Sequence, residues 1–215
     1  LNVMRQSLIP GGLEVVAYNL NRQTQSLRVF EYGSVYQRLP EKTAQTLEGY
    51  EEHSCFLLMM SGTPESSWRQ ESGKSDYFRL KGYLDLLLRR FGIDLFQLWA
   101  EPAPSDVFAE GMTYKIPGGQ SQTLVSLGTV NPALCRKFGV RQAVYAAEIN
   151  WPALLTLIRR NKVAFSELPK FPEVRRDLAL LLDEGVSYAD LRAAALKQGK
   201  KLLRQVGLFD VYRGE

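Results

Sequence analysis

Residues 112–127 have the sequence MTYKIPGGQSQTLVSL, in which two partly apolar runs flank a turn rich in proline and glycine. Met112–Ile116 and Gln122–Leu127 have the composition of strands, and Pro117-Gly118-Gly119 suits a reversal of the chain between them. Strands joined this closely pair antiparallel, because a parallel pair needs a much longer crossover. We therefore predict an α+β fold built on an antiparallel sheet flanked by helices, and not a parallel doubly wound sheet.

The surrounding sequence supplies further strands and helices for this sheet. The additional predicted strands, which are apolar or alternate in polarity, are Leu27–Tyr36, His53–Met60, Leu95–Ala100 and Ala143–Ile149, and the second strand of the hairpin extends over Thr123–Val130. The predicted helices, each with an apolar stripe or a proline start, are Pro10–Arg22, Asp76–Phe91, 131–139 and Trp151–Ile158. Pro40–Glu52 is polar and lacks periodicity, so we predict a loop there and assign it no function.

The C-terminal part of the chain has a separate pattern. We predict strands at Arg176–Leu182 and Val206–Tyr212, with a helix between them that begins at Ser187 and ends at Gly199. A β-α-β unit of this size is half of a ferredoxin-like fold and buries too little surface to be stable alone. We therefore predict a core domain at residues 1–165 and a truncated second domain at 166–215.

Composition and charge exclude few function classes. The chain has 215 residues, 45% of them hydrophobic, and an interspersed net charge of +4 that permits nucleic-acid contact without arguing for it. Cys55 and Cys135 lie far apart in the sequence and the chain has only one histidine, His53, so they form no metal-binding pattern, and we predict buried, reduced thiols. We find no signal peptide or apolar run of spanning length, and expect a cytoplasmic protein without membrane contact.

Several short motifs follow one another along the chain: LNVMRQSL (1–8), RVFEYG (28–33), DYFRLKG (76–82), LGTVNP (127–132), FPEVRRD (171–177) and LFDVYRG (208–214). Taken in this order, they resemble the β subunit of bacterial phenylalanine–tRNA ligase. The resemblance implies a class II aminoacyl-tRNA synthetase-like core that is a degenerate copy of the α subunit's catalytic domain. It also implies the start of a ferredoxin-like anticodon-binding domain, so we expect the chain to be a piece of that subunit.

The same resemblance implies partners and cofactors. The family forms an (αβ)2 assembly with an α subunit and charges tRNA with phenylalanine at the expense of ATP. We expect ATP and Mg²⁺ in the complete enzyme, bound by the α subunit or by domains missing here, and no cofactor in this chain.

Amino-acid activation needs fixed positive groups, because negative charge develops on the α-phosphate of ATP. Class II enzymes supply one arginine from an aromatic-Arg-x-Glu strand and another from a glycine-rich turn. Here Glu31 lies one position late relative to Arg28, and a slip of one residue moves a strand side chain to the opposite face. Residues 145–152 contain neither glycine nor arginine. We therefore predict no catalytic, cofactor-binding or metal-binding residue, and an inactive chain on its own.

A basic cluster near the C-terminus is the candidate for tRNA contact, although its cations also suit a solvated helix end. Its members are Lys197, Lys200, Lys201 and Arg204. We predict a structural role: association with the α subunit and positioning of tRNA. Two alternatives stay open, namely a stand-alone adenylating enzyme and a free RNA-binding or small-ligand module.

Overall fold

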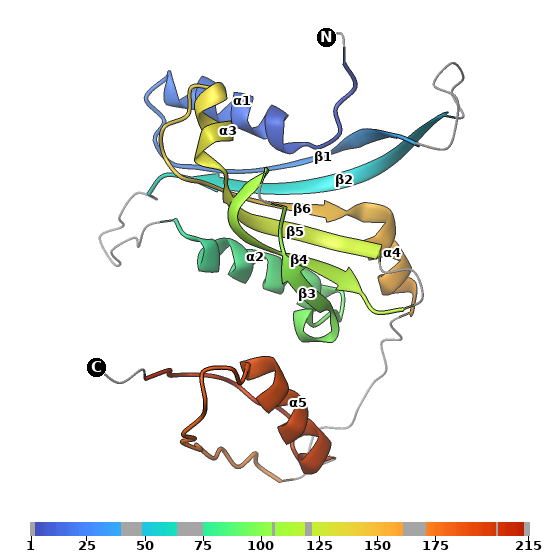
Figure 1. Ribbon diagram of the computed structural model, residues 1–215, viewed down its shortest axis with the longest axis vertical. Helices are drawn as coiled ribbons and strands as arrows, with labels where there is room; N and C mark the ends of the chain where they lie inside the picture. The colour runs from blue at the N-terminus through green and yellow to red at the C-terminus, as the bar shows by residue number, and fades with distance from the viewer. Residues whose placement is uncertain are drawn as a thin grey trace. The chain divides into compact units, whose positions relative to one another are not determined.

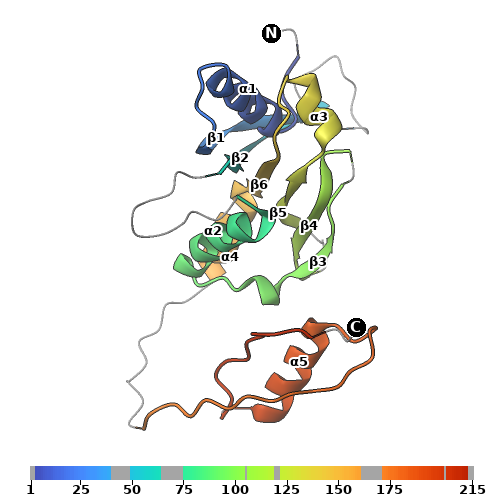
Figure 2. The same cartoon turned by 90° about the vertical axis from the view of Figure 1, so that its left-hand side faces the viewer.

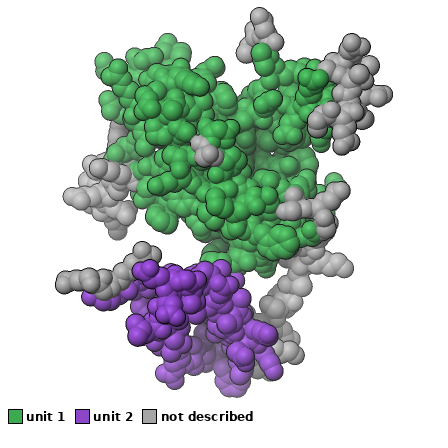
Figure 3. Space-filling model, viewed as in Figure 1, with its two compact units in different colours: residues 1–164 green, residues 165–215 purple. Residues whose placement is uncertain are grey.

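The computed structural model describes residues 3–39, 49–63, 75–104, 106–118, 122–160, 171–200 and 202–212. The chain divides into two compact units, Leu1–Ala164 and Phe165–Glu215, which are coloured separately in Figure 3.

A six-stranded antiparallel sheet with the order β1-β2-β6-β5-β4-β3 forms the centre of the first unit (Figure 1). The strands are β1 (Leu27–Arg38), β2 (Tyr50–Ser61), β3 (Trp99–Pro102), β4 (Phe108–Ile116), β5 (Gln122–Val130) and β6 (Val144–Asn150). The predicted hairpin is present, since β4 and β5 pair with Tyr114 opposite Val125. The predicted α+β class with an antiparallel sheet is confirmed.

Two helices lie on each face of the sheet (Figures 1 and 2). One face carries α1 (Ile9–Leu20) and α3 (Pro132–Lys137), and the other carries α2 (Tyr77–Arg90) and α4 (Trp151–Arg160). Each face has its own apolar core, because successive strand residues point to opposite sides. In β2, for example, Leu57 joins the core under α1, whereas Met60 joins the core under α2.

The helices begin and end where their sequences predict. The Asp76 side chain caps α2 by accepting a hydrogen bond from the N–H of Arg79 at 2.7 Å, and Gly92 follows the helix with φ +72°. Leu80, Leu84 and Leu88, spaced by four residues, form the buried stripe of α2. This stripe places the opposite face of the helix, which bears several arginines, toward solvent.

Two predictions for the first unit are wrong in part. Leu95–Ala100 is not one strand: the Asp94 side chain accepts the N–H of Phe96 at 3.0 Å and draws Leu95–Gln97 into the 3₁₀ helix η2, so that β3 begins only at Trp99. The predicted loop Pro40–Glu52 overlaps β2, whose residues Tyr50–Glu52 pair with the end of β1. Their exposure at the end of the ribbon explains why they lack an apolar pattern, and residues 40–48 lie outside the described residues.

The second unit contains one helix, α5 (Tyr188–Gly199), among its described residues. Ser187 caps it as predicted, accepting the N–H of Asp190 at 3.2 Å. The predicted strands Arg176–Leu182 and Val206–Tyr212 are wrong, because neither segment forms a ladder. A split β-α-β unit needs a third strand between its two strands, and none lies in residues 171–200 or 202–212. No described residue of this unit is buried.

Candidate functional site

The strand motif around Arg28 does not assemble an arginine–glutamate pair. Arg28 points to the α2 face, where its guanidinium carbon lies 6.0 Å from the centroid of the Tyr83 ring. Glu31 points to the α1 face and accepts a hydrogen bond from Arg5 at 2.7 Å. As strand geometry predicts for two residues three positions apart, Arg28 and Glu31 therefore lie on opposite faces of the sheet.

The middle of β6, the strand that leads into α4, holds two buried alanines and one half-buried carboxylate. Ala146 and Ala147 are fully buried, and the side chain of Asn150 caps α4 by accepting the N–H of Ala153 at 3.0 Å. Between them, Glu148 accepts the backbone N–H of Leu8 at 2.6 Å and the hydroxyl of Ser7 at 3.0 and 3.1 Å. This carboxylate thus holds the chain at the start of α1.

The electrostatics of Glu148 follow from its burial. Burial raises the pKa of this carboxyl above its usual range, while the hydrogen bonds from Leu8 and Ser7 act in the opposite direction. The sequence offered no signal for this role, since the two partners are about 140 positions away in the chain.

The side chains of both cysteines and of the histidine are at least partly buried. Cys55 and Cys135 are buried free thiols, as predicted, and burial raises the pKa of the Cys55 thiol to about 12. His53 is half-buried in β2. Within the described ranges there is no group of three or more His, Cys, Asp or Glu side chains that could hold a metal ion. A search of the same residues finds no helix with the length and apolar character needed to span a bilayer.

A cluster of aromatic side chains lies on the α2 and α4 face of the β1–β2 ribbon. Phe30 stacks on Phe56 with centroids 5.9 Å apart, and Trp151 lies 5.8 Å from Phe56 and 5.4 Å from Tyr32. Phe30 is 74% exposed and Tyr32 is 57% exposed. Alternation along β1 predicts that Phe30 and Tyr32 lie on the same face of the sheet. The sequence alone does not predict that both are exposed there.

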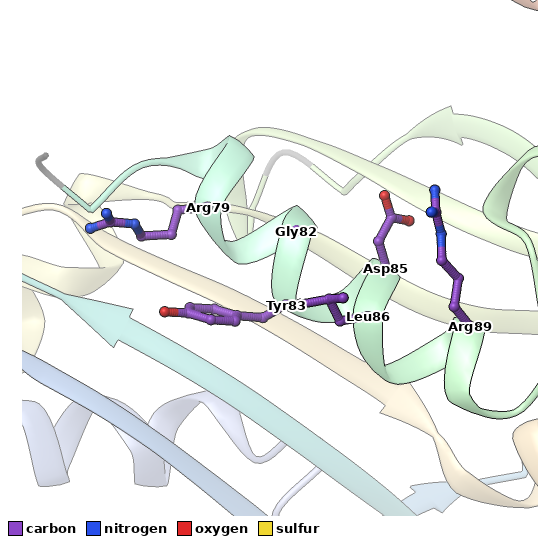
Figure 4. A pocket seen from close by; sticks show the side chains of 6 residues that line it. All are labelled: Arg79, Gly82, Tyr83, Asp85, Leu86 and Arg89. Carbon is purple, nitrogen blue, oxygen red and sulfur yellow. The ribbon is translucent and has the colours of Figure 1, made fainter. Parts of the chain in front are cut away.

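A groove of about 570 Å³ runs beside this cluster, between the β1–β2 ribbon and α2. Its walls are almost wholly apolar; the residues that line it are Arg28, Val29, Phe30, Phe56, Leu58, Met59, Met60, Leu80, Tyr83, Leu86, Leu87 and Arg90. A second hollow of about 470 Å³ shares Tyr83 and Leu86 with it and lies over the outer face of α2 (Figure 4). We name the first of the two, between the β1–β2 ribbon and α2, the α2 groove.

The structure describes three of the four residues of the predicted basic cluster. Lys197 is exposed in the last turn of α5, and Lys200, also exposed, follows the helix with φ +44°. Arg204 is exposed and lies 3.5 Å from the carboxylate of Glu173. Lys201 lies outside the described residues.

The first unit is thus an α+β domain. Its exposed surfaces described above carry aromatic and arginine side chains. A family model described as the phenylalanyl-tRNA synthetase beta chain CLM domain matches residues 1–151, and one described as a ferredoxin-fold anticodon binding domain matches residues 169–215. The chain therefore belongs to the phenylalanine–tRNA ligase β-subunit family.

Curated relatives agree along the whole chain. Phenylalanine–tRNA ligase β subunits of Bacteroides thetaiotaomicron, Porphyromonas gingivalis and Vibrio parahaemolyticus are 38%, 39% and 33% identical to it, and each match covers 100% of this chain. The chain spans about a quarter of their length, 26% of the first two and 27% of the third. Among solved structures, a pyrrolysyl-tRNA synthetase of Desulfitobacterium hafniense is similar over 73% of this chain and 50% of its own, with 22% identity and a TM-score of 0.48.

Proposed function

We propose that this chain is a non-catalytic part of a phenylalanine–tRNA ligase β subunit, which associates with the α subunit and helps to position tRNA. In the complete (αβ)2 enzyme, ATP, Mg²⁺ and phenylalanine bind elsewhere, and the enzyme charges tRNA with phenylalanine in the cytoplasm. The core domain would be a class II synthetase-like sheet, residues 1–165, and residues 166–215 would begin the anticodon-binding domain.

The observation that carries this proposal is the set of side chains in the middle of β6, shortly before α4 begins. A cation is needed where negative charge develops on a phosphate. Here the side chains are those of two buried alanines and of the half-buried Glu148, whose carboxylate accepts hydrogen bonds from Ser7 and Leu8. A carboxylate at this place repels a nucleotide phosphate and serves the packing of α1 instead.

Association through the first unit is supported by exposed apolar side chains on α1. Val15 is 42% exposed and Tyr18 is 56% exposed, and with Gly11 they lie at spacings of four and three residues on one stripe of the helix. A stripe of this kind packs against a helix of another subunit, and the glycine permits close approach.

Positioning of tRNA is assigned to the second unit. Lys197, Lys200 and Arg204 are exposed cations within one short region, and cations of this kind meet phosphates. Because Arg204 has Glu173 nearby, we expect the three cations together to contribute only a few phosphate contacts.

ATP–pyrophosphate exchange by the purified chain tests the absence of catalysis. We expect no exchange above a no-protein control with phenylalanine or any other amino acid. Clear exchange would show that the chain adenylates by itself and would replace this proposal with a stand-alone enzyme.

A further inference from the structure

The helical layer on the α2 face of the sheet is incomplete over its β1 edge. Helices α2 and α4 pack mainly on β2, β5 and β6. On this same face β1 presents Arg28, Phe30 and Tyr32, all of which are exposed. On the other face, α1 covers β1 and β2. Among the described elements, β1 is therefore covered by a helix on one side only.

Helix α2 has a second, largely apolar stripe that faces the side of the uncovered strand β1. Tyr83, Leu86, Leu87 and Arg90 follow a spacing of three, four and seven residues, which is the pattern of one helix face. Leu86 is 65% exposed and Tyr83 is 41% exposed. Figure 4 shows Tyr83 and Arg79 extending from one side of α2, with Asp85 and Arg89 on another. This lateral stripe is distinct from the buried stripe that anchors α2 to the sheet.

Gly82 sits in the middle of α2 beside the lateral stripe. A Cβ atom at this position would have no atom within 4 Å, so the fold itself does not require a glycine there. Glycine within a helix costs about 1 kcal/mol relative to alanine. Gly82 therefore weakens α2 without a packing reason inside the unit. Its presence is explained if another backbone approaches α2 closely at this point.

The charges around the α2 groove have one predominant sign. Arg28 and Arg90 line the groove, and Arg79 and Arg89 line the adjoining hollow. Among the described residues of the two linings the one carboxylate, that of Asp85, lies 3.3 Å from the ammonium of Lys81. An apolar floor with arginines at its rim fits a ligand that is apolar in the middle and acidic at its flanks.

We propose that the α2 groove binds an amphipathic helix of a partner polypeptide, with apolar side chains on the β1–β2 ribbon and acidic side chains beside Arg28 and Arg90. Such a helix would lie along α2, contact it closely at Gly82, and complete the helical layer. This inference goes beyond the proposed function and does not depend on it, because it concerns a surface on the opposite side of the sheet from α1.

Two other occupants fit less well. A second copy of this surface would bring arginines against arginines, which opposes a symmetric pairing. A single-stranded nucleic acid needs polar partners for its bases and phosphates, whereas the groove lining offers polar side chains only at Arg28, Tyr83 and Arg90.

Binding of model helices to the whole 215-residue chain tests the proposal. The probes are two peptides of about 20 residues, long enough to form helices, one of leucine, alanine and glutamate and the other with lysine in place of glutamate. Isothermal titration should show the acidic helix binding at least about tenfold more tightly than the basic one, a difference of about 1.4 kcal/mol. The double variant Arg28→Glu/Arg90→Glu should reverse this preference, and Gly82→Leu should weaken both peptides.

The control is Arg136→Glu/Lys137→Glu, which makes the same change of charge on α3, on the other face of the sheet. It should keep the preference of the wild-type chain, and thermal unfolding should confirm that every variant is folded. Equal affinity for the two peptides, or equal effects of the groove and control variants, would overturn the proposal. So would binding of single-stranded RNA, or concentration-dependent dimerisation, that only the groove variants abolish.

Discussion

Removal of the Glu148 carboxylate should destabilise the first unit more than any other single polar change that we describe. Glu148→Ala leaves the N–H of Leu8 without its acceptor, and Leu8 is fully buried. It also removes the acceptor of the Ser7 hydroxyl. A hydrogen bond to a charged group contributes about 1.5–3 kcal/mol, and an unsatisfied buried donor costs about 1–3 kcal/mol.

These terms overlap, so we expect Glu148→Ala to lower the free energy of unfolding by about 3 kcal/mol. For a unit of this size that corresponds to a fall in melting temperature of about 6–12 °C. Glu148→Gln keeps an oxygen for Leu8 and a polar group for Ser7, so it should lose less than about 1 kcal/mol. Circular dichroism during urea and thermal unfolding measures both, with the exposed α1 variant Glu14→Ala as control.

The result that would refute this reasoning is specific. If Glu148→Ala unfolds within about 0.5 kcal/mol of the wild-type chain, as an ordinary surface substitution does, then this carboxylate does not hold α1 in place. In that case the middle of β6 would not be devoted to the packing of α1.

Four further predictions follow from the same structure. Because the pKa of Glu148 is raised by burial, the stability it contributes is complete below its ordinary pKa and is lost as pH rises through the raised value; urea unfolding at a series of pH values should show the wild-type chain losing stability relative to Glu148→Gln as pH rises above the ordinary pKa of a glutamate, and a constant difference would contradict this. Leu84→Ala, at a fully buried position, should cost about 2–5 kcal/mol, whereas Leu86→Ala, two residues later and 65% exposed, should stay within about 0.5 kcal/mol; similar losses would show that the two faces of α2 are misassigned. Gly82→Ala should stabilise the chain by up to about 1 kcal/mol, whereas Gly128→Ala should destabilise it because its Cβ would lie 2.3 Å from the carbonyl oxygen of Glu110; the opposite order in thermal unfolding would count against the packing described. Cys55, with its thiol pKa raised to about 12, should react with a thiol reagent at pH 8 only after urea unfolding, and fast labelling of the folded chain would refute its burial.

The sheet and its helices could be predicted because their signals are local. The alternation of residues 112–127 gives the hairpin, and the four-residue spacing of Leu80, Leu84 and Leu88 gives α2. The failures occur where a single side chain or a distant partner decides. Asp94 bends the chain before β3, and the ladder that extends β2 to Tyr50 depends on β1.

The candidate site was less accessible to sequence reasoning for the same physical cause. The placement of Arg28 and Glu31 on opposite faces of the sheet follows from the two-residue period of a strand and could be predicted. The roles of Glu148 and of the α2 groove depend on contacts between segments far apart in the chain, such as those of Leu8 with Glu148. In the C-terminal unit, sequence composition predicted two strands, but a strand exists only with a partner to pair with.

Co-purification with the α subunit tests the central claim most directly. The α subunit of a phenylalanine–tRNA ligase, from the same organism as this chain, would be expressed with the tagged chain, and the eluate examined by size-exclusion chromatography with light scattering. We expect a stable complex that contains both polypeptides and that Tyr18→Glu on α1 weakens. A well-folded chain that elutes alone in the presence of the α subunit would show that the chain does not associate with that subunit.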